Sequence, residues 1–236
     1  METLTNCPIC NNDTFIPFIE ISTDGEYYLC DCGCAFLNPR MTEEELVEYY
    51  RSGEYRENTS ELDPDNILGT KQSRDRASYI GHMVRKVKAE TFLDIGCYKS
   101  DLLKEVSGLI PGVVCSGVDP DPKMKNSTFT VYKSVDEIKE TFDLITCIQT
   151  LEHVLNPVPF MDKVYSLLNK DGVLLVEVPN RRANMVAFVP PHHVIAYDEK
   201  SLHKVMEKFS IVKTILHGQP DRSPLDLNLL VLATKG

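Results

Sequence analysis

The sequence predicts an α/β fold, a mostly parallel seven-stranded sheet with an antiparallel edge pair, preceded by a small cysteine-rich module. Three observations support this prediction. From residue 90 onward, apolar runs typical of strands alternate with helical periods. Five of the eight cysteines fall before residue 35. The apolar fraction, 42% of 236 residues, is enough for one large or two modest cores and too high for a disordered chain.

The first 40 residues contain two cysteine clusters with zinc-ribbon spacing. Cys7 and Cys10 form a C-x-x-C pair, and Cys30, Cys32 and Cys34 follow. A segment of roughly 40 residues buries too little apolar surface to fold alone, whereas Zn²⁺ on four thiolates contributes on the order of 10 kcal/mol. We expect a structural zinc ion on Cys7, Cys10, Cys30 and Cys32, with Cys34 as the substitute fourth ligand. A disulfide with free thiols is the alternative, which a reducing compartment disfavours.

A helical linker is expected between this module and the sheet. Thr42 and Glu45 form a capping box, which predicts a helix over residues 42–51. Residues 52–70 are polar and contain Gly and Pro, as in a linker or mobile lid. An apolar i, i+3, i+4, i+7 repeat predicts a second helix over residues 72–88. The expected regions are a zinc-ribbon-like module over 1–40, a helical linker or lid over 41–89, and an α/β domain over 90–236.

Seven β-rich runs define the α/β domain. Because helical stripes separate most of them, the sheet should be mostly parallel with helices on both faces. No helix separates the last two runs, so they should form the antiparallel edge pair. The predicted strands are Thr91–Ile95, Val113–Val118, Thr128–Val131, Phe142–Ile148, Val173–Val178, Ile211–His217 and Asn228–Thr234.

The net charge and the chain start limit the partners. The chain has 25 Lys and Arg against 35 Asp and Glu, a net charge of −10. Nucleic-acid binding depends on neutralising phosphates, so a nucleic-acid partner is disfavoured. No apolar run approaches the roughly 18 residues of a membrane-spanning helix, and the first residues do not resemble a signal peptide. We expect a cytoplasmic protein with no nucleic-acid or membrane partner.

Acidic residues follow the first two predicted strands of the α/β domain. Asp94 precedes Gly96 and a helix, and Asp119 ends the next strand. Ligands of such sheets bind at the carboxyl ends of the strands, where a carboxylate can accept hydrogen bonds from both ribose hydroxyls. This pattern favours a nucleoside-containing cofactor, and solvated loop acids are the alternative.

Several segments together resemble class I S-adenosylmethionine-dependent methyltransferases, which have a Rossmann-like fold. The resemblance covers about residues 90–236. The matching segments are Leu93-Asp94-Ile95-Gly96-Cys97, Val118-Asp119-Pro120, Phe142-Asp143-Leu144-Ile145, Leu151-Glu152-His153-Val154 and Val176-Glu177-Val178-Pro179-Asn180. The cysteine module, followed by Phe36-Leu37-Asn38-Pro39-Arg40, resembles the zinc-binding start of a subgroup that includes sugar C-methyltransferases. The resemblance implies methyl transfer from S-adenosylmethionine to a small molecule, such as a sugar or a nucleotide-linked sugar.

The resemblance also implies cofactor-binding residues. Asp94 and Gly96 would hold the amino-acid end of S-adenosylmethionine, and Asp119, followed by Pro120, would hold the ribose. The remaining contacts would be Ser134 and Val135 beside the adenine, Ile148 and Gln149 on the methyl side, and Tyr98 bordering the cavity or near the sulfonium.

The glycine loop departs from the family pattern Asp-x-Gly-x-Gly-x-Gly. This chain keeps Gly96 but has Tyr98 and Ser100 at the next two glycine positions. If either position has a positive φ, a residue other than glycine costs roughly 1–2 kcal/mol. A catalytically impaired binding protein with the methyltransferase fold is therefore an alternative function.

Three histidines are candidate general bases, because an imidazole with a pKa near 6.5 suits proton removal at neutral pH. His153 follows Glu152, and His192 and His193 lie in the insertion that lines the acceptor pocket in the family. Structural roles are the alternative for His153 and His193, and His192 is the weaker candidate. No catalytic metal is expected. An RNA or protein methyltransferase would need a basic face that the composition does not provide, and the sequence specifies neither the acceptor nor the oligomeric state.

Overall fold

The computed structural model describes residues 1–21, 25–52, 67–121, 128–218 and 227–236. Within it the chain forms two compact units. The first unit contains Met1–Leu46, Cys147–Ser166 and Leu174–Gly236, and the second unit contains Val47–Thr146 and Leu167–Val173. Most of the expected linker or lid at 52–70 lies outside the described residues.

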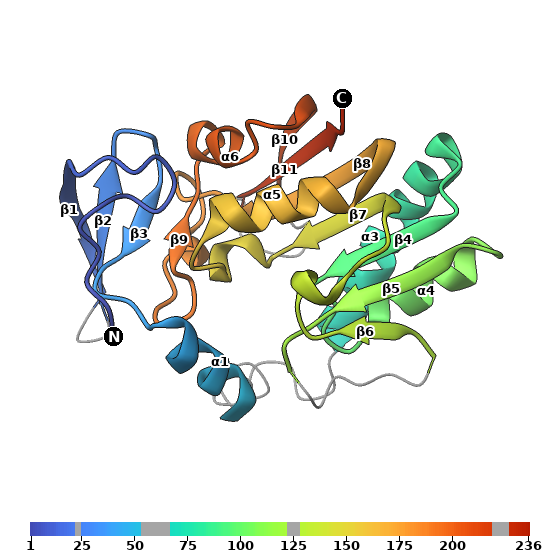
Figure 1. Ribbon diagram of the computed structural model, residues 1–236, viewed down its shortest axis with the longest axis horizontal. Helices are drawn as coiled ribbons and strands as arrows, with labels where there is room; N and C mark the ends of the chain where they lie inside the picture. Colours follow the sequence, from blue (N-terminus) through green and yellow to red (C-terminus); the bar gives the residue numbers. More distant parts are fainter. Residues whose placement is uncertain (22–24, 53–66, 122–127, 219–226) are drawn as a thin grey trace. The chain divides into compact units, whose positions relative to one another are not determined.

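The larger sheet has seven strands. They are β4 (Thr91–Ile95), β5 (Val114–Val118), β6 (Thr130–Tyr132), β7 (Phe142–Ile148), β8 (Leu168–Pro179), β10 (Ser210–Gly218) and β11 (Leu227–Thr234). Their order in the sheet is β10-β11-β8-β7-β4-β5-β6 (Figure 1). β4 pairs in parallel with β5, β5 pairs in parallel with β6, and β10 pairs antiparallel with β11. The predicted sheet and its antiparallel edge pair are therefore confirmed.

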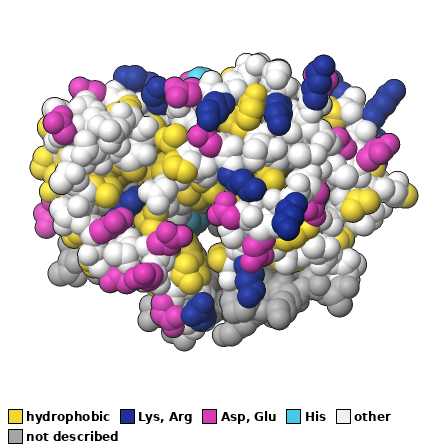
Figure 2. Space-filling model, in the orientation of Figure 1, with side chains coloured by type: hydrophobic (Ala, Val, Ile, Leu, Met, Phe, Trp, Pro, Cys, Tyr) yellow, Lys and Arg dark blue, Asp and Glu magenta, His cyan; other side chains and the backbone are white. Residues whose placement is uncertain are grey.

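The helices follow the predicted stripes, except that the second linker helix begins at Ile67, inside the segment expected to be a linker or lid, rather than at residue 72. They are α1 (Glu43–Ser52), α3 (Ile67–Val87), α4 (Asp101–Leu109), α5 (Pro157–Leu167) and α6 (Glu199–Val205). The capping box before α1 is present, because Thr42 N donates to Glu45 Oε2 at 2.8 Å and Glu45 N donates to Thr42 Oγ1 at 3.3 Å. Figure 2 shows acidic side chains over α1, whose first turn has three glutamates. Among the described residues, every helix is too short or too polar to span a lipid bilayer.

The second unit buries both faces of β4 and the apolar stripe of α4. Phe92 and Leu93 in β4 and Leu103 in α4 are fully buried. Gly117 in β5 lies directly against Cys97, and a Cβ atom at Gly117 would lie 2.5 Å from the Cys97 sulfur. Glycine at this position therefore lets β5 approach the turn that follows β4.

A smaller sheet in the first unit joins the cysteine module to a distant part of the chain. Its strands, in order, are β1 (Phe15–Glu20), β2 (Glu26–Cys30), β3 (Ala35–Leu37) and β9 (Ile195–Ala196) (Figure 1). Each neighbouring pair is antiparallel. Because β9 begins two residues after His193, the loop with His192 and His193 is anchored to the cysteine module.

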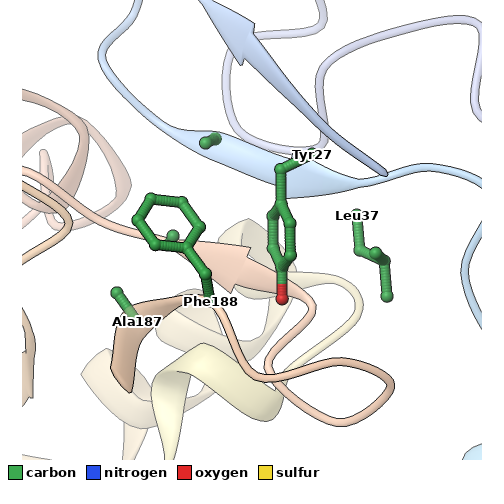
Figure 3. Close-up of a cluster of buried hydrophobic side chains, with 6 residues drawn as sticks. Tyr27, Leu37, Ala187 and Phe188 are labelled. Atoms are coloured by element: carbon green, nitrogen blue, oxygen red, sulfur yellow. The ribbon is translucent and has the colours of Figure 1, made fainter. Parts of the chain in front are cut away.

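Apolar side chains pack this small sheet against the loop around Phe188. In Figure 3 the Tyr27 ring lies between Phe188 and Leu37. The Tyr27 and Phe188 rings meet edge to face with centroids 5.2 Å apart, and both side chains are buried. The Tyr27 hydroxyl donates to the His193 carbonyl oxygen, so β2 also holds the histidine loop through a buried hydrogen bond.

Candidate functional site

The carboxyl group of Asp94 ends β4 in a buried position. The residue is only 4% exposed, and its Oδ1 accepts a 2.7 Å hydrogen bond from the Thr146 hydroxyl. Burial raises the pKa of Asp94 to about 7, with Asp119 adding to the rise and the Thr146 hydrogen bond and the Arg76 charge opposing it. A cation bound beside this carboxyl group would favour its charged form.

The loop after β4 is held to the end of β5 by backbone hydrogen bonds. Gly96 N donates to the Val118 carbonyl at 2.8 Å, and Tyr98 N donates to Asp119 Oδ2 at 2.9 Å. Asp119 Oδ1 accepts from Asp121 N at 3.0 Å. Each Asp119 oxygen thus accepts a hydrogen bond from a backbone N–H group, which fixes the orientation of the carboxylate.

The two substituted glycine positions both have the left-handed conformation that glycine favours. The φ angles are 82° at Gly96, 44° at Tyr98 and 61° at Ser100. The strain expected of roughly 1–2 kcal/mol for each residue other than glycine therefore applies here. The Tyr98 ring is partly exposed and lies 5.1 Å from the Lys99 ammonium, whereas Ser100 is fully buried.

The structure thus brings Asp94, Gly96, Tyr98 and Asp119 together within the second unit. Pro120 is exposed directly after Asp119. Two further predicted residues follow β6, the neighbour of β5. Ser134 Oγ accepts from Asp136 N and caps a short 3-10 helix, and Val135 is buried.

The end of β7 forms a tight turn in the first unit. Ile148 is its last residue, and Gln149 has a φ of 50°. Glu177 in β8 fixes this turn twice, because its carbonyl accepts from Gln149 N at 2.8 Å and its Oε1 accepts from Gln149 Nε2 at 3.2 Å. Asn228 Nδ2 also donates to Glu177 Oε1, at 3.3 Å.

The three predicted base histidines form one cluster in the first unit. The ring centroid of His153 lies 4.7 Å from that of His193 and 5.5 Å from that of His192. His153 Nδ1 lies 3.0 Å from the His192 carbonyl oxygen. Burial lowers the pKa of His153 to about 3, with the charge of His192 adding to the effect, and burial also lowers the pKa of His193. The rings are therefore neutral near pH 7 and weakly basic.

Sequence reasoning gave Glu152 no role in this cluster. Its side chain is 2% exposed, and its Oε1 lies 4.0 Å from His153 Nε2. The only sequence signal for a role of Glu152 was its position directly before His153. Thr146, the hydrogen-bond partner of Asp94, was also missed, since its position inside a predicted strand gives no such signal.

The five N-terminal cysteines also converge in the first unit. The sulfur atoms of Cys7 and Cys32 are 3.6 Å apart, those of Cys7 and Cys34 are 3.5 Å apart, and those of Cys10 and Cys30 are 3.5 Å apart. Tetrahedral Zn²⁺ with Zn–S bonds of about 2.3 Å separates its sulfur ligands by roughly 3.8 Å. The thiols of Cys32 and Cys34 lower the pKa of the Cys7 thiol to about 3. All five cysteines are free, and their spacing fits a tetrahedral thiolate site.

Comparison with known proteins identifies related sequences. The family described as "Methyltransferase domain" matches residues 48–210. A ubiquinone biosynthesis O-methyltransferase of Glaesserella parasuis serovar 5 is 28% identical over 155 residues, which are 57% of this chain and 64% of that protein. The same enzyme of Haemophilus ducreyi is 26% identical over 155 residues, with the same shares. The chain thus spans less than two thirds of the length of these relatives.

Solved structures share the fold. A 1,6-didemethyltoxoflavin-N1-methyltransferase of Burkholderia thailandensis, with S-adenosylhomocysteine bound, has a TM-score of 0.63 at 16% identity and covers 93% of this chain and 99% of its own. Magnesium protoporphyrin IX methyltransferase of Synechocystis, with S-adenosylmethionine bound, has a TM-score of 0.60 at 15% identity and covers 84% of this chain and 100% of its own. Because the family match spans more than half of the sequence, the chain belongs to the methyltransferase-domain family.

Proposed function

We propose that the protein is an S-adenosylmethionine-dependent methyltransferase that acts on a small molecule. The observation that carries this proposal is the loop of the second unit, where Asp94, Gly96 and Asp119 surround a turn with glycine-type backbone angles. The family membership of the chain and the bound cofactors of its structural neighbours support the same function.

The residues of this loop suit the chemistry of S-adenosylmethionine. The ammonium of its amino-acid end would offset the buried charge of Asp94, whose pKa is raised to about 7 by burial. The oriented oxygens of Asp119 can accept hydrogen bonds from the ribose hydroxyls without rearranging. The partial exposure of the Tyr98 ring is consistent with its predicted place at the border of the cavity. We also assign Pro120 to the ribose side, Ser134 and Val135 to the adenine, and Ile148 and Gln149 to the methyl side.

When bound, the cofactor supplies an electrophilic methyl group. Most of the rate would come from alignment, with the acceptor atom held about 3 Å from the methyl carbon. The chain then needs a group that accepts the proton of the acceptor. We assign that role to His153 or His193, with His192 as the weaker candidate, because these neutral rings lie together in the first unit.

We further propose an acceptor with a hydroxyl group. The ubiquinone-biosynthesis relatives are named O-methyltransferases, and the resemblance of the cysteine module points to a sugar or a nucleotide-linked sugar. The test is a panel of such acceptors incubated with S-adenosylmethionine, with S-adenosylhomocysteine release as the readout. Release that depends on the acceptor supports the proposal. A panel without turnover by a protein that binds the cofactor would reject this acceptor class.

Calorimetric titration of the protein with S-adenosylhomocysteine tests the cofactor assignment. We expect saturable binding with one site per chain. No heat of binding at millimolar ligand would instead favour the catalytically impaired binding protein. An RNA or protein methyltransferase is not proposed, because the net charge of −10 provides no excess of bases.

We also propose that Cys7, Cys10, Cys30 and Cys32 hold a structural zinc ion. The sulfur atoms of these four residues all lie within 4.8 Å of one another. Cys34 is the substitute for Cys32, because its sulfur lies 3.5 Å from that of Cys7 and 3.6 Å from that of Cys32. Elemental analysis should find about one zinc per chain. Zinc loss in Cys32→Ala but not in Cys34→Ala would confirm Cys32 as the fourth ligand. Zinc loss in Cys34→Ala but not in Cys32→Ala would make Cys34 the fourth ligand. Disulfides without bound metal would reject the zinc site.

A further inference from the structure

A second group of metal-ligating side chains lies in the first unit, separate from the cysteines. Glu152, His153 and His193 each offer one ligand atom, and these three atoms lie within 4.8 Å of one another. Glu152 and His153 come from the 3-10 turn Leu151–His153, and His193 comes from the loop before β9. Two imidazoles and one carboxylate form a ligand set that suits divalent first-row transition metals.

The hydrogen bond of His153 prepares its other ring nitrogen for coordination. Because the His192 carbonyl oxygen can only accept, His153 Nδ1 must carry the proton in their 3.0 Å hydrogen bond. The lone pair of His153 is then on Nε2, the atom 4.0 Å from Glu152 Oε1. Metal-binding histidines usually make this kind of bond, in which the second ring nitrogen donates to a carbonyl or carboxylate.

His193 provides the second, independent observation. The residue is 7% exposed, and its Nδ1 is buried without a hydrogen-bond partner among the residues that the structure describes. A buried polar atom without a partner is unfavourable, and a bound metal ion would satisfy it.

The backbone around these three residues is anchored. Val194 N donates to the Glu152 carbonyl at 2.9 Å, which ties the histidine loop to the turn that contains Glu152 and His153. Tyr27 donates to the His193 carbonyl from β2. The ligand atoms therefore come from rigid segments, as a metal site requires.

We propose that Glu152, His153 and His193 form a binding site for one divalent transition-metal ion. Three protein ligands leave coordination positions for water or another oxygen donor. One of these positions would take the oxygen of the methyl acceptor and lower the pKa of its hydroxyl. With the ion bound, the lone pairs of His153 and His193 are used in coordination, so His192 is the candidate base that would take the proton. This last step rests on the proposed function, whereas metal binding does not.

The test uses protein with zinc already bound to its cysteines. In one titration Mn²⁺ is added, and the electron paramagnetic resonance signal of the free ion measures how much is bound. In a parallel titration Co²⁺ is added, and the visible absorption of the bound ion is recorded. We expect one site per chain. A Co²⁺ spectrum without thiolate charge-transfer bands distinguishes this site from exchange into the cysteine site.

Three variants locate the ion. His193→Ala and the isosteric Glu152→Gln should weaken metal binding at least about tenfold. His192→Ala is the matched control, because it removes a neighbouring imidazole and keeps the carbonyl that orients His153. Circular dichroism and retained zinc are used to check that each variant is folded. If His193→Ala does not fold, the metal affinity of Glu152→Gln alone decides the result.

The proposal is overturned if neither Mn²⁺ nor Co²⁺ binds at millimolar concentration. It is also overturned if His192→Ala weakens binding as much as Glu152→Gln, or if Glu152→Gln keeps full affinity. Calorimetry with S-adenosylhomocysteine on the same samples separates this failure from failure of the proposed function. A protein that binds the cofactor but no metal disproves only the metal site.

Discussion

The two units hold their candidate functional groups by different means. In the second unit, Asp94, Tyr98 and Asp119 come from the ends of two neighbouring strands and are oriented by backbone hydrogen bonds between those ends. In the first unit, His153 and His193 lie 40 residues apart in sequence, and β9 and Tyr27 connect the loop of His193 to the cysteine module. The loop of the second unit thus depends on local chain geometry, whereas the histidine cluster depends on a distant module being folded.

Removal of the zinc ligand should give the largest difference between the units. Cys7→Ala should release the metal and remove on the order of 10 kcal/mol from the folding of the cysteine module. Hydrogen exchange should then show lost amide protection in β2, β3 and β9 but retained protection in β4 and β5. Cys115→Ala is the control, because this buried thiol in β5 is outside the cysteine cluster. Unchanged protection in β9 would contradict the dependence of the histidine loop on the module.

Asp94 should make the stability of the protein depend on pH. Its folded-state pKa of about 7 is above the ordinary value of 3.8, so the folded state holds the proton more tightly. As pH rises between these two values, the unfolding free energy should fall by about 1.4 kcal/mol per pH unit and then level off. Denaturant unfolding of the ligand-free protein from pH 4 to pH 8 measures this, and Asp94→Asn should flatten the profile.

Removing the Thr146 hydroxyl should change the same pH dependence of stability in a predictable direction. The hydroxyl lowers the pKa of Asp94 through its 2.7 Å hydrogen bond. Thr146→Val should therefore extend the falling part of the profile to higher pH. A profile that is the same in wild type and Asp94→Asn would show that another group causes the pH dependence.

Asp119→Asn should weaken cofactor binding, and it should also lose one of the two loop hydrogen bonds, because asparagine keeps only one acceptor oxygen. Hydrogen bonds to a charged group contribute about 1.5–3 kcal/mol, so S-adenosylhomocysteine affinity should fall about 10- to 100-fold in calorimetry. Asp101→Asn on α4 is the control, because Asp101 pairs with Lys104 at 2.9 Å near the surface. Equal affinity of wild type and Asp119→Asn would remove Asp119 from the site.

Tyr98→Gly should have the smallest effect. Glycine removes the strain of the 44° φ angle, roughly 1–2 kcal/mol, but loses about 0.5–1 kcal/mol through its greater freedom in the unfolded chain. We expect a stability gain of about 1 kcal/mol or less in denaturant unfolding. Tyr98→Ala removes the ring and keeps the strain, so it should not show this gain. The same change in both variants would assign the effect to the ring.

The strands of the larger sheet could be predicted from local patterns. The predicted bounds of β4 and β7 match the structure, because Gly96 ends the first apolar run and Gln149 ends the second. β8 begins at Leu168, five residues before the predicted start at Val173. The prediction missed these residues because Asn169 to Asp171 are polar and resemble a turn. A pattern based on apolar runs does not detect a strand segment whose middle residues are polar.

The candidate site was only partly predictable. The glycine pattern identified Tyr98 and Ser100 as the positions where a positive φ would cause strain, and the structure has a positive φ at both. The pairing of β3 with β9 could not be predicted, because the two residues of β9 carry no periodicity and Ala196 pairs with Ala35, 161 residues away in sequence. The grouping of Glu152 with His153 and His193 depends on that pairing and was missed for the same reason.

The sequence by itself determined which chemistry each segment carries, since strand ends, caps and cysteine spacings follow from residues close together in the chain. The tertiary structure alone decided that the histidine loop is a strand partner of the cysteine module, and that one glutamate and two histidines share a buried position. The physical reason is that contacts between distant segments are selected by the burial of the whole core, which no local pattern records.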